Sequence, residues 1–244
     1  MNDLDQKRLI KKLKFCSLNS RGGLRPNSEK ITFLKKNINL ADTAFICLQD
    51  LGSTNQINTW FFPVLSLALA SESDANRSAK ICTFFNSNFI THCNSRSLIE
   101  GRLIESEFQL TNASERFLVF NIYVAASNPS SFISSCLPLI QNSIDAHPYH
   151  DYFFIGDFNV NFFKPSPTLH TILKFCDANN FVELDPTAIP TWRGDGLRDS
   201  ESKLDICFSN ITGWEQSIIM TPMSDHAIIF FAPPPSPFSQ RKFG

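Results

Sequence analysis

The chain has 244 residues, of which 43% are hydrophobic and 18% are charged, with a formal net charge of −1. A chain of this length and composition can bury one large core, which excludes disordered, collagen-like and repeat-built proteins. Its longest apolar runs have the length of a strand and stay below the roughly 18 residues of a membrane-spanning helix. We therefore expect one soluble α/β domain without a membrane partner.

The charges are unevenly distributed along the chain. Residues 1–36 contain ten Lys and Arg and three Asp and Glu, a balance of +7, whereas the remaining residues contain twelve against twenty, a balance of −8. A basic flank beside an acidic body suits a protein that meets a polyanion with one rim and gathers carboxylates elsewhere. A solvated charged helix or tail would produce the same pattern.

Seven cysteines are spread over the chain without a C-x-x-C pair. Most of them lie in apolar segments, where a free thiol behaves as a small buried hydrophobe. The charged first residues, MNDLDQKRLIKK, contain no apolar signal region. These features favour a reducing, intracellular compartment over disulfide or zinc binding.

The first predicted unit is a strand, a helix and a second strand. The apolar run Phe15–Leu18 predicts a strand that ends at Asn19, and residues 28–38 (SEKITFLKKNI) predict a capped amphipathic helix. The next strand, Ala44–Leu48, leads to Asp50. Because such a connection returns the chain to the same sheet, Asn19 and Asp50 should lie at one sheet edge.

The middle of the chain is predicted to form a β-hairpin. Trp60–Ala70 is ambiguous between a strand and a buried loop, Ser71–Ala79 is typical of a polar surface loop, and Ile81–Phe85 predicts a strand. Leu103–Leu110 alternates like a half-exposed antiparallel strand, and Phe117–Tyr123 returns beside it. The hairpin therefore ends at a tyrosine.

The segment Tyr152–Asn159 (YFFIGDFN) lies between two predicted helices, over residues 132–144 and 169–176. Four apolar or aromatic residues that run into a glycine predict a strand buried on both faces, with Asp157 and Asn159 on the loop at its carboxyl end. Asp157 can take a proton from water, and Asn159 can hold an oxygen of the group under attack. Gly, Asp and Asn are also common turn residues.

Two further polar segments precede apolar runs near the end of the chain. Ser202–Asp205 (SKLD) leads into Ile206–Phe208, and Ser224–His226 (SDH) leads into Ala227–Phe231. The polar loop Arg193–Glu201 precedes the first of them, and long polar loops on a rigid sheet often carry recognition.

The candidate functional residues all stand at predicted strand ends. Several carboxylates crowded at one edge repel one another unless a cation neutralises them, and oxygen ligands without a Cys or His cluster favour Mg²⁺, with Mn²⁺ as a substitute. The residues are Asn19, Asp50, Tyr123, Asp157, Asn159, Asp205, Asp225 and His226.

The order GDFN, S-x-L-D and SDH resembles the endonuclease/exonuclease/phosphatase (DNase I-like) superfamily. The likeness runs from about Phe15 to Phe231 and is greatest to the apurinic-type endonuclease domain of non-LTR (LINE-type) retrotransposons. It implies a four-layer α/β/β/α sandwich of two packed mixed sheets flanked by helices. The expected organisation is a frayed basic leader over residues 1–14, an endonuclease domain over 15–232 and a Pro-rich tail or linker over 233–244.

The resemblance also implies a role for each candidate. Asp157 would align or deprotonate the attacking water, and His226, held by Asp205, would contact the scissile phosphate. Asn159 and Tyr123 would hold phosphate oxygens. The implied metal residues are Asp50, Asn19 and Asp225, the last also assisting catalysis.

The implied activity is Mg²⁺-dependent nicking of target DNA, leaving a 3′-hydroxyl primer for a reverse transcriptase domain or protein of the same element. This role implies a nuclear location. In the retrotransposon relatives that the sequence resembles, the loop matching Arg193–Glu201 lies near the DNA. If DNA is the ligand, binding should weaken steeply with added salt. The candidate DNA contacts are Thr191, Trp192, Arg193, Arg198 and Arg21.

One position departs from the family pattern, because the second-strand motif usually ends in Glu and here LQD ends in Asp50. The carboxylate is drawn back by one C–C bond, about 1.5 Å. Two alternatives stay open: a phosphatase or phospholipase, because such enzymes share the hydrolytic core of the superfamily, and a DNA-binding module with weakened catalysis, because Asp50 replaces the usual Glu.

Overall fold

The computed structural model describes residues 10–22, 28–53, 64–73, 78–184, 187–194, 201–222 and 224–234. Most described strands form two six-stranded sheets. The first has the order β13-β14-β1-β2-β4-β3, with β1 (Lys14–Asn19), β2 (Thr43–Ser53), β3 (Ser66–Ser73), β4 (Ser78–Phe85), β13 (Glu215–Ile219) and β14 (Ile228–Ala232). The second has the order β5-β6-β7-β8-β12-β9, with β5 (Ile90–Ile99), β6 (Leu103–Leu110), β7 (Arg116–Tyr123), β8 (Asp151–Asp157), β9 (Val182–Glu183) and β12 (Asp205–Ser209). A short hairpin pairs β10 (Trp192–Arg193) with β11 (Glu201–Ser202).

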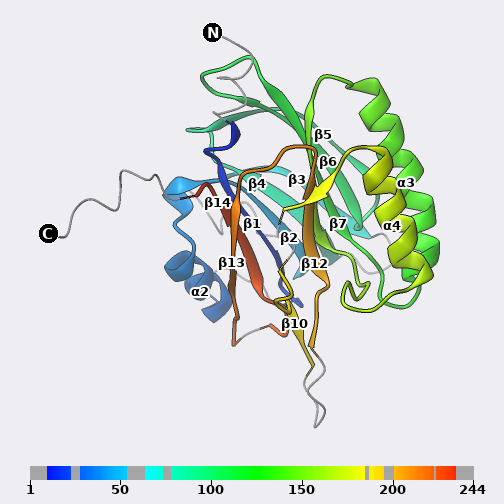
Figure 1. Ribbon diagram of the computed structural model, residues 1–244. Helices are drawn as coiled ribbons and strands as arrows, with labels where there is room; N and C mark the ends of the chain where they lie inside the picture. Colours follow the sequence, from blue (N-terminus) through cyan, green and yellow to red (C-terminus); the bar gives the residue numbers. More distant parts are fainter. Residues whose placement is uncertain are drawn as a thin grey trace, which may run out of the picture.

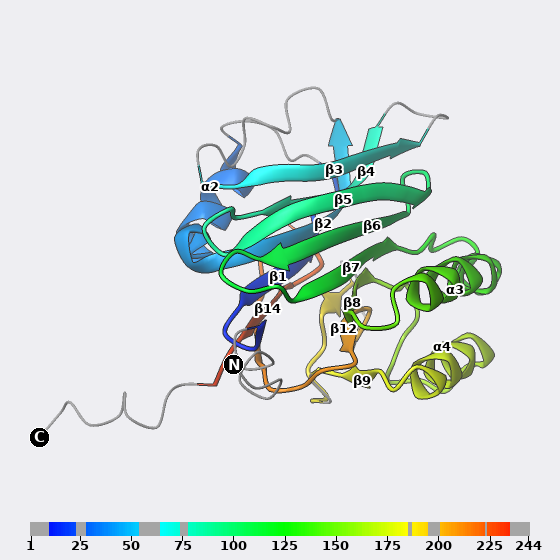
Figure 2. The same cartoon turned by 90° about the horizontal axis from the view of Figure 1, so that it is seen from above.

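The sheets pack face to face, and helices cover their outer faces (Figures 1 and 2). Phenylalanines from both sheets, among them Phe15, Phe45 and Phe153, fill the layer between them. Helix α2 (Glu29–Asn37) packs on the first sheet, preceded by its N-cap Ser28 and followed by the 3₁₀ turn η1 (Leu40–Asp42). Helices α3 (Pro129–Ala146) and α4 (Pro167–Ala178) pack on the second sheet. The predicted four-layer sandwich of mixed sheets is therefore confirmed.

The local sequence explains where these helices begin. Ser28 caps α2, and its hydroxyl oxygen accepts a hydrogen bond from the amide of Ile31 at 3.3 Å. Asn128 and Ser166 cap α3 and α4 in the same way, and each is followed by a proline at the first helical position. The apolar side of each helix then faces its sheet, which fixes the strands beneath it.

The sheet topology brings strand ends from both sheets to one edge. Strands β1 and β2 are parallel, with Asn19 opposite Gln49, and β7 and β8 are parallel, with Tyr123 opposite Asp157. Strand β12 runs antiparallel to β8 and places Asp205 opposite Asp157. The carboxyl ends of the parallel strands and the start of β12 therefore meet, as the sequence predicts.

A buried polar network joins the two sheets just beneath that edge. The side-chain amide of Gln49 on β2 donates to Asn121 Oδ1 on β7 at 2.7 Å, and it also contacts Ser17 Oγ at 3.0 Å. Asn121 Nδ2 donates in turn to Cys82 O at 2.8 Å and Thr83 Oγ1 at 3.2 Å on β4. Because buried polar groups need partners, this network fixes the register of one sheet against the other.

Three sequence expectations require correction. Strand β5 is not predicted, because its polar side chains are mostly exposed along a sheet edge. Residues 71–73 and 78–79 belong to β3 and β4 rather than to a surface loop, because backbone pairing outweighs their polar composition. The leader is not frayed at residues 10–13, where Ile10 and Leu13 are buried and Trp214 Nε1 donates to Leu13 O at 2.8 Å. In the described ranges, no helix has both the length and the apolar character needed to cross a membrane.

Candidate active site

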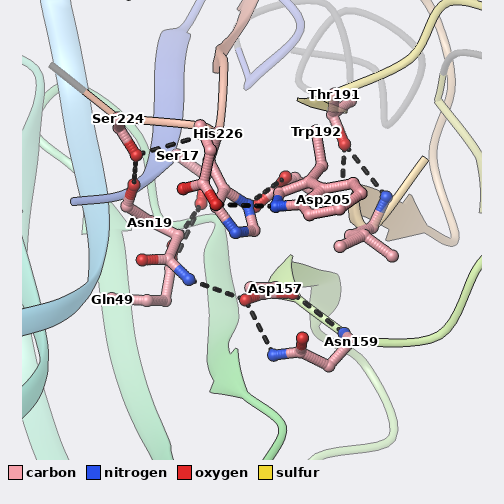
Figure 3. Close-up of polar contacts among 12 residues, drawn as sticks. Ser17, Asn19, Gln49, Asp157, Asn159, Thr191, Trp192, Asp205, Ser224 and His226 are labelled. Carbon is pink, nitrogen blue, oxygen red and sulfur yellow. Dashed lines mark hydrogen bonds and ion pairs between the residues drawn. The ribbon is translucent and has the colours of Figure 1, made fainter. Parts of the chain in front are cut away.

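Asp157, at the end of β8, is the centre of the polar cluster at the sheet edge (Figure 3). It is fully buried, and its carboxylate accepts from Asn19 Nδ2 at 2.7 Å and from the backbone and side-chain amides of Asn159 at 2.8 and 2.9 Å. Gly156 precedes it with a φ of +141°, and a Cβ there would collide with the carbonyl oxygen of Ile122 on β7. The glycine of GDFN is therefore required for the close approach of β7 and β8.

Asp205 and His226 form a buried pair beside Asp157. His226 Nδ1 lies 2.9 Å from Asp205 Oδ2, and the backbone of His226 is held by Ser224, whose hydroxyl donates to Asn19 O at 3.0 Å (Figure 3). Asp205 comes from the second sheet, whereas His226 precedes β14 of the first. The Asp205–His226 and Asn19–Asp157 contacts therefore both join the two sheets.

The charge of Asp205 affects the protonation of both Asp157 and His226. Burial and the neighbouring Asp205 raise the pKa of Asp157 from 3.8 to about 7. Burial lowers the pKa of His226, but the charge and hydrogen bond of Asp205 outweigh it and raise that pKa from 6.5 to about 9. One ligand atom from each residue lies within 4.8 Å of the others, so the cluster has the spacing of a metal site.

Asp50 stands on an irregularity of β2. The pairing of β2 with β4 shifts between Gln49 and Gly52, and Asp50 has a left-handed φ of +46°. Its carbonyl oxygen accepts from Ser20 Oγ at 2.8 Å and from Gly22 N at 2.5 Å. Asp tolerates this backbone conformation better than most residues, so the shorter side chain matches the local geometry.

Tyr123 lies at the end of β7, facing the carboxylates. Burial, Asp50 and Asp157 raise its pKa to about 12, so the phenol stays protonated at neutral pH. The guanidinium carbon of Arg102 lies 4.5 Å from the centre of the Tyr123 ring. Sequence reasoning did not identify Arg102, because no local pattern links a turn residue to a strand end twenty-one positions later.

Asp225 connects the site to the β10–β11 hairpin. One of its oxygens, Oδ2, lies 2.8 Å from both Trp192 Nε1 and Arg21 Nη1. Its other oxygen, Oδ1, is buried and has no hydrogen-bond partner among the described residues. Of this side chain, Oδ1 is therefore the atom left to meet an added ligand.

A polar cavity of about 700 Å³ adjoins this side of the site. Arg21, Lys30 and Arg193 line it together with Asp225. Lys30 Nζ donates to the carbonyl oxygens of Ser20 and Gly22 at 2.7 and 2.9 Å, which fixes the loop that holds Asp50. Lys30 was not identified from the sequence, since a lysine in the first turn of a helix carries no functional signal.

The structure gathers the eight predicted catalytic and metal residues at one end of the two sheets. The hairpin residues differ in their placement. Thr191 is fully buried, and its hydroxyl accepts from the amides of Leu204 and Asp205 at 3.0 and 2.9 Å, so it holds the Asp205 strand and cannot present its side chain to DNA. Trp192 is partly exposed, and Arg193 is exposed. Arg198 lies outside the described residues.

No protein-family model and no curated protein matches the sequence. Solved structures do match. The endonuclease domain of TRAS1, a telomere-specific non-LTR retrotransposon, superposes with a TM-score of 0.67 and 13% identity over 92% of this chain and 99% of that one. TDP2 from D. rerio, complexed with single-strand DNA product, superposes with a TM-score of 0.70 and 12% identity over 90% of this chain and 97% of that one. The mannosyl-6-phosphatase Bt3783 from Bacteroides thetaiotaomicron superposes with a TM-score of 0.60 and 11% identity over 90% of this chain and 98% of that one. The chain therefore has the fold shared by these three proteins, the fold that its GDFN, SKLD and SDH motifs predict.

Proposed function

We propose that this protein is a divalent-metal-dependent DNA endonuclease that hydrolyses one phosphodiester bond and leaves a 3′-hydroxyl. The observation that carries the proposal is the buried cluster of Asp157, Asp205 and His226, which joins a carboxylate of raised pKa to an imidazole of raised pKa. Such a pairing is typical of hydrolytic sites, where acid and base must differ in protonation at one pH.

The residues can divide the work of hydrolysis among them. Asp157, with a pKa of about 7, takes the proton of the water whose oxygen forms the new bond to phosphorus. The His226 cation and the Tyr123 hydroxyl donate to phosphoryl oxygens and stabilise the charge that builds up there. The bond from phosphorus to O3′ breaks and its electron pair stays on O3′, which takes a proton from solvent. One product therefore carries a 3′-hydroxyl and the other a 5′-phosphate. Asn19 and Asn159 keep Asp157 oriented for its role.

The donor set fits Mg²⁺ or Mn²⁺. Asp225 Oδ1 is a buried carboxylate oxygen without a partner among the described residues, and a hard cation prefers such oxygen ligands. Asp50, Asn19 and Asp225 are the residues proposed to hold it. When bound, the ion would polarise the phosphoryl group and an attacking water.

DNA as the substrate is supported by the cavity beside Asp225. Arg21 and Arg193 line it, and guanidinium groups suit phosphate oxygens. TRAS1 is described as a retrotransposon endonuclease, and TDP2 was solved with a DNA product, so two proteins of this fold act on or bind nucleic acid. A retrotransposon role, a reverse transcriptase partner and a nuclear location extend the proposal.

Nicking of supercoiled plasmid tests this function. Wild-type protein with Mg²⁺ should yield open-circular DNA with 3′-hydroxyl ends that a polymerase can extend, and EDTA should prevent nicking. Asp157→Ala and His226→Ala should lose activity by about 100-fold or more. Asp177→Ala and His170→Ala, on the exposed side of α4, are the matched controls and should nick normally. Nicking that survives both active-site substitutions would refute the proposal.

The second candidate is a phosphatase or phospholipase, which the Bt3783 match keeps open. Release of phosphate from a phosphomonoester or an inositol lipid, without plasmid nicking, would favour it. A DNA-binding module with weakened catalysis would show neither activity but would bind DNA with an affinity that falls steeply with salt.

A further inference from the structure

The turn between β5 and β6 is fixed against the end of β7. Arg102 N donates to Ile99 O at 3.0 Å, and Tyr123 N donates to Arg102 O at 2.8 Å. Gly101, with a φ of +65°, donates its amide to Ser71 Oγ at 2.8 Å. The backbone therefore holds Arg102 and Tyr123 side by side, whatever their side chains do.

The Arg102 side chain stacks on Tyr123. Its guanidinium carbon lies 4.5 Å from the centre of the Tyr123 ring, which is a cation–π contact. This contact uses the face of the ring, so the phenol O–H at the ring edge is not consumed by it. Among the described residues no carboxylate forms an ion pair with Arg102, so its charge is not consumed by a structural salt bridge.

We propose that Arg102 is a positioning residue of the active site, which holds the Tyr123 ring in place so that its hydroxyl can donate a hydrogen bond to a bound phosphoryl oxygen. This inference rests on the proposed phosphodiesterase function. Without Arg102, the carboxylates of Asp50 and Asp157, both of which bear electrostatically on Tyr123, would compete for the phenol proton and draw the hydroxyl away from the substrate. The Arg102 cation also opposes the rise in the pKa of Tyr123 and so makes the phenol a stronger donor.

The first test is a double-mutant cycle on the nicking reaction. Arg102→Gln and Tyr123→Phe should each lower kcat by about 10- to 100-fold with little change in KM, because the donor acts mainly on the charge of the transition state. The double variant should be no worse than Tyr123→Phe. Arg102→Lys should keep an intermediate kcat. Arg116→Gln, at the opposite end of β7, is the matched control and should match wild type.

Chemical rescue separates positioning from a general role in folding. Added guanidinium ion should restore part of the kcat of Arg102→Ala, but nothing to the Arg102→Ala, Tyr123→Phe double variant. The inference would be overturned if the kcat losses of Arg102→Gln and Tyr123→Phe multiplied in the double variant. It would also be overturned if guanidinium ion restored kcat to the Arg102→Ala, Tyr123→Phe double variant.

Binding of inorganic phosphate, followed by calorimetry, gives a readout that does not depend on DNA cleavage. Arg102→Gln and Tyr123→Phe should weaken it by the same factor, and the double variant should weaken it no further. If this pattern holds while the wild type fails to nick DNA, the proposed substrate is wrong and the role of Arg102 stands. If the wild type binds no phosphate, or Arg102→Gln binds and nicks like wild type, the inference is overturned.

Discussion

Replacing Asp205 by Asn should move the working pH of the site. Asp205 is the largest influence raising the pKa of His226, from 6.5 to about 9, and a rise of that size corresponds to about 3 kcal/mol in favour of the imidazolium. Asn keeps the shape of the side chain and an oxygen for Nδ1, but it removes the charge. Burial, which lowers the His226 pKa, remains, and so do the charges of Asp157 and Asp225, which raise it. We therefore expect that pKa to fall from about 9 toward the ordinary histidine value of 6.5.

The loss of activity in Asp205→Asn should be largest above neutral pH. With a pKa near 6.5, only about one thirtieth of His226 is protonated at pH 8, so kcat of Asp205→Asn should fall roughly 30-fold there and much less at pH 6. The pH–rate profile measures this, and NMR titration of the five histidines, with the His226 signal assigned by His226→Gln, measures the pKa directly. Asp177→Asn is the control. A His226 pKa that stays near 9 in Asp205→Asn would refute the reasoning.

Three other predictions concern the same edge. Asp50→Glu should restore or raise Mg²⁺-dependent nicking, because it returns the carboxylate to the usual length; a marked loss would show that the site is built around the shorter side chain and its left-handed backbone. Without metal, the thermal stability of the protein should fall as pH rises from about 4 to 9. Folding raises the pKa of Asp157 and of His226, so proton binding by both groups stabilises the folded state at low pH. That stabilisation is lost as pH passes about 7 for Asp157 and about 9 for His226, and calorimetry with and without Mg²⁺ checks this. Gly156→Ala should destabilise the fold by about 3 kcal/mol or more in urea titration, because the new methyl group collides with β7, whereas Gly22→Ala, which meets no atom, should cost about 1 kcal/mol from its φ alone.

The sequence predicts the parts of the site that lie in contiguous motifs. Asp157 and Asn159 follow a fully apolar strand, and Asp205 and His226 precede two more, so strand ends and functional groups coincide in the pattern. The layers follow from the same alternation of apolar strands and amphipathic helices.

Contacts between distant segments carry no such signal. Arg102 is placed by a turn and Lys30 by a helix, and the partner of each is chosen by the tertiary fold. The polar edge strand β5 lacks the apolar alternation that marks a strand, because half of its side chains are exposed and only Ile90 is buried. Sequence patterns therefore find the catalytic groups more readily than the residues that hold them.

The division of the site between the two sheets has a consequence for how such a protein can change. The first sheet carries Asn19, Asp50 and His226, and the second carries Tyr123, Asp157 and Asp205. The buried Gln49–Asn121 network joins the two sheets beneath these residues. Neither half holds a usable set of groups alone. A substitution in the Gln49–Asn121 network can therefore abolish activity by a small shift of one sheet against the other, even though every catalytic side chain is still present.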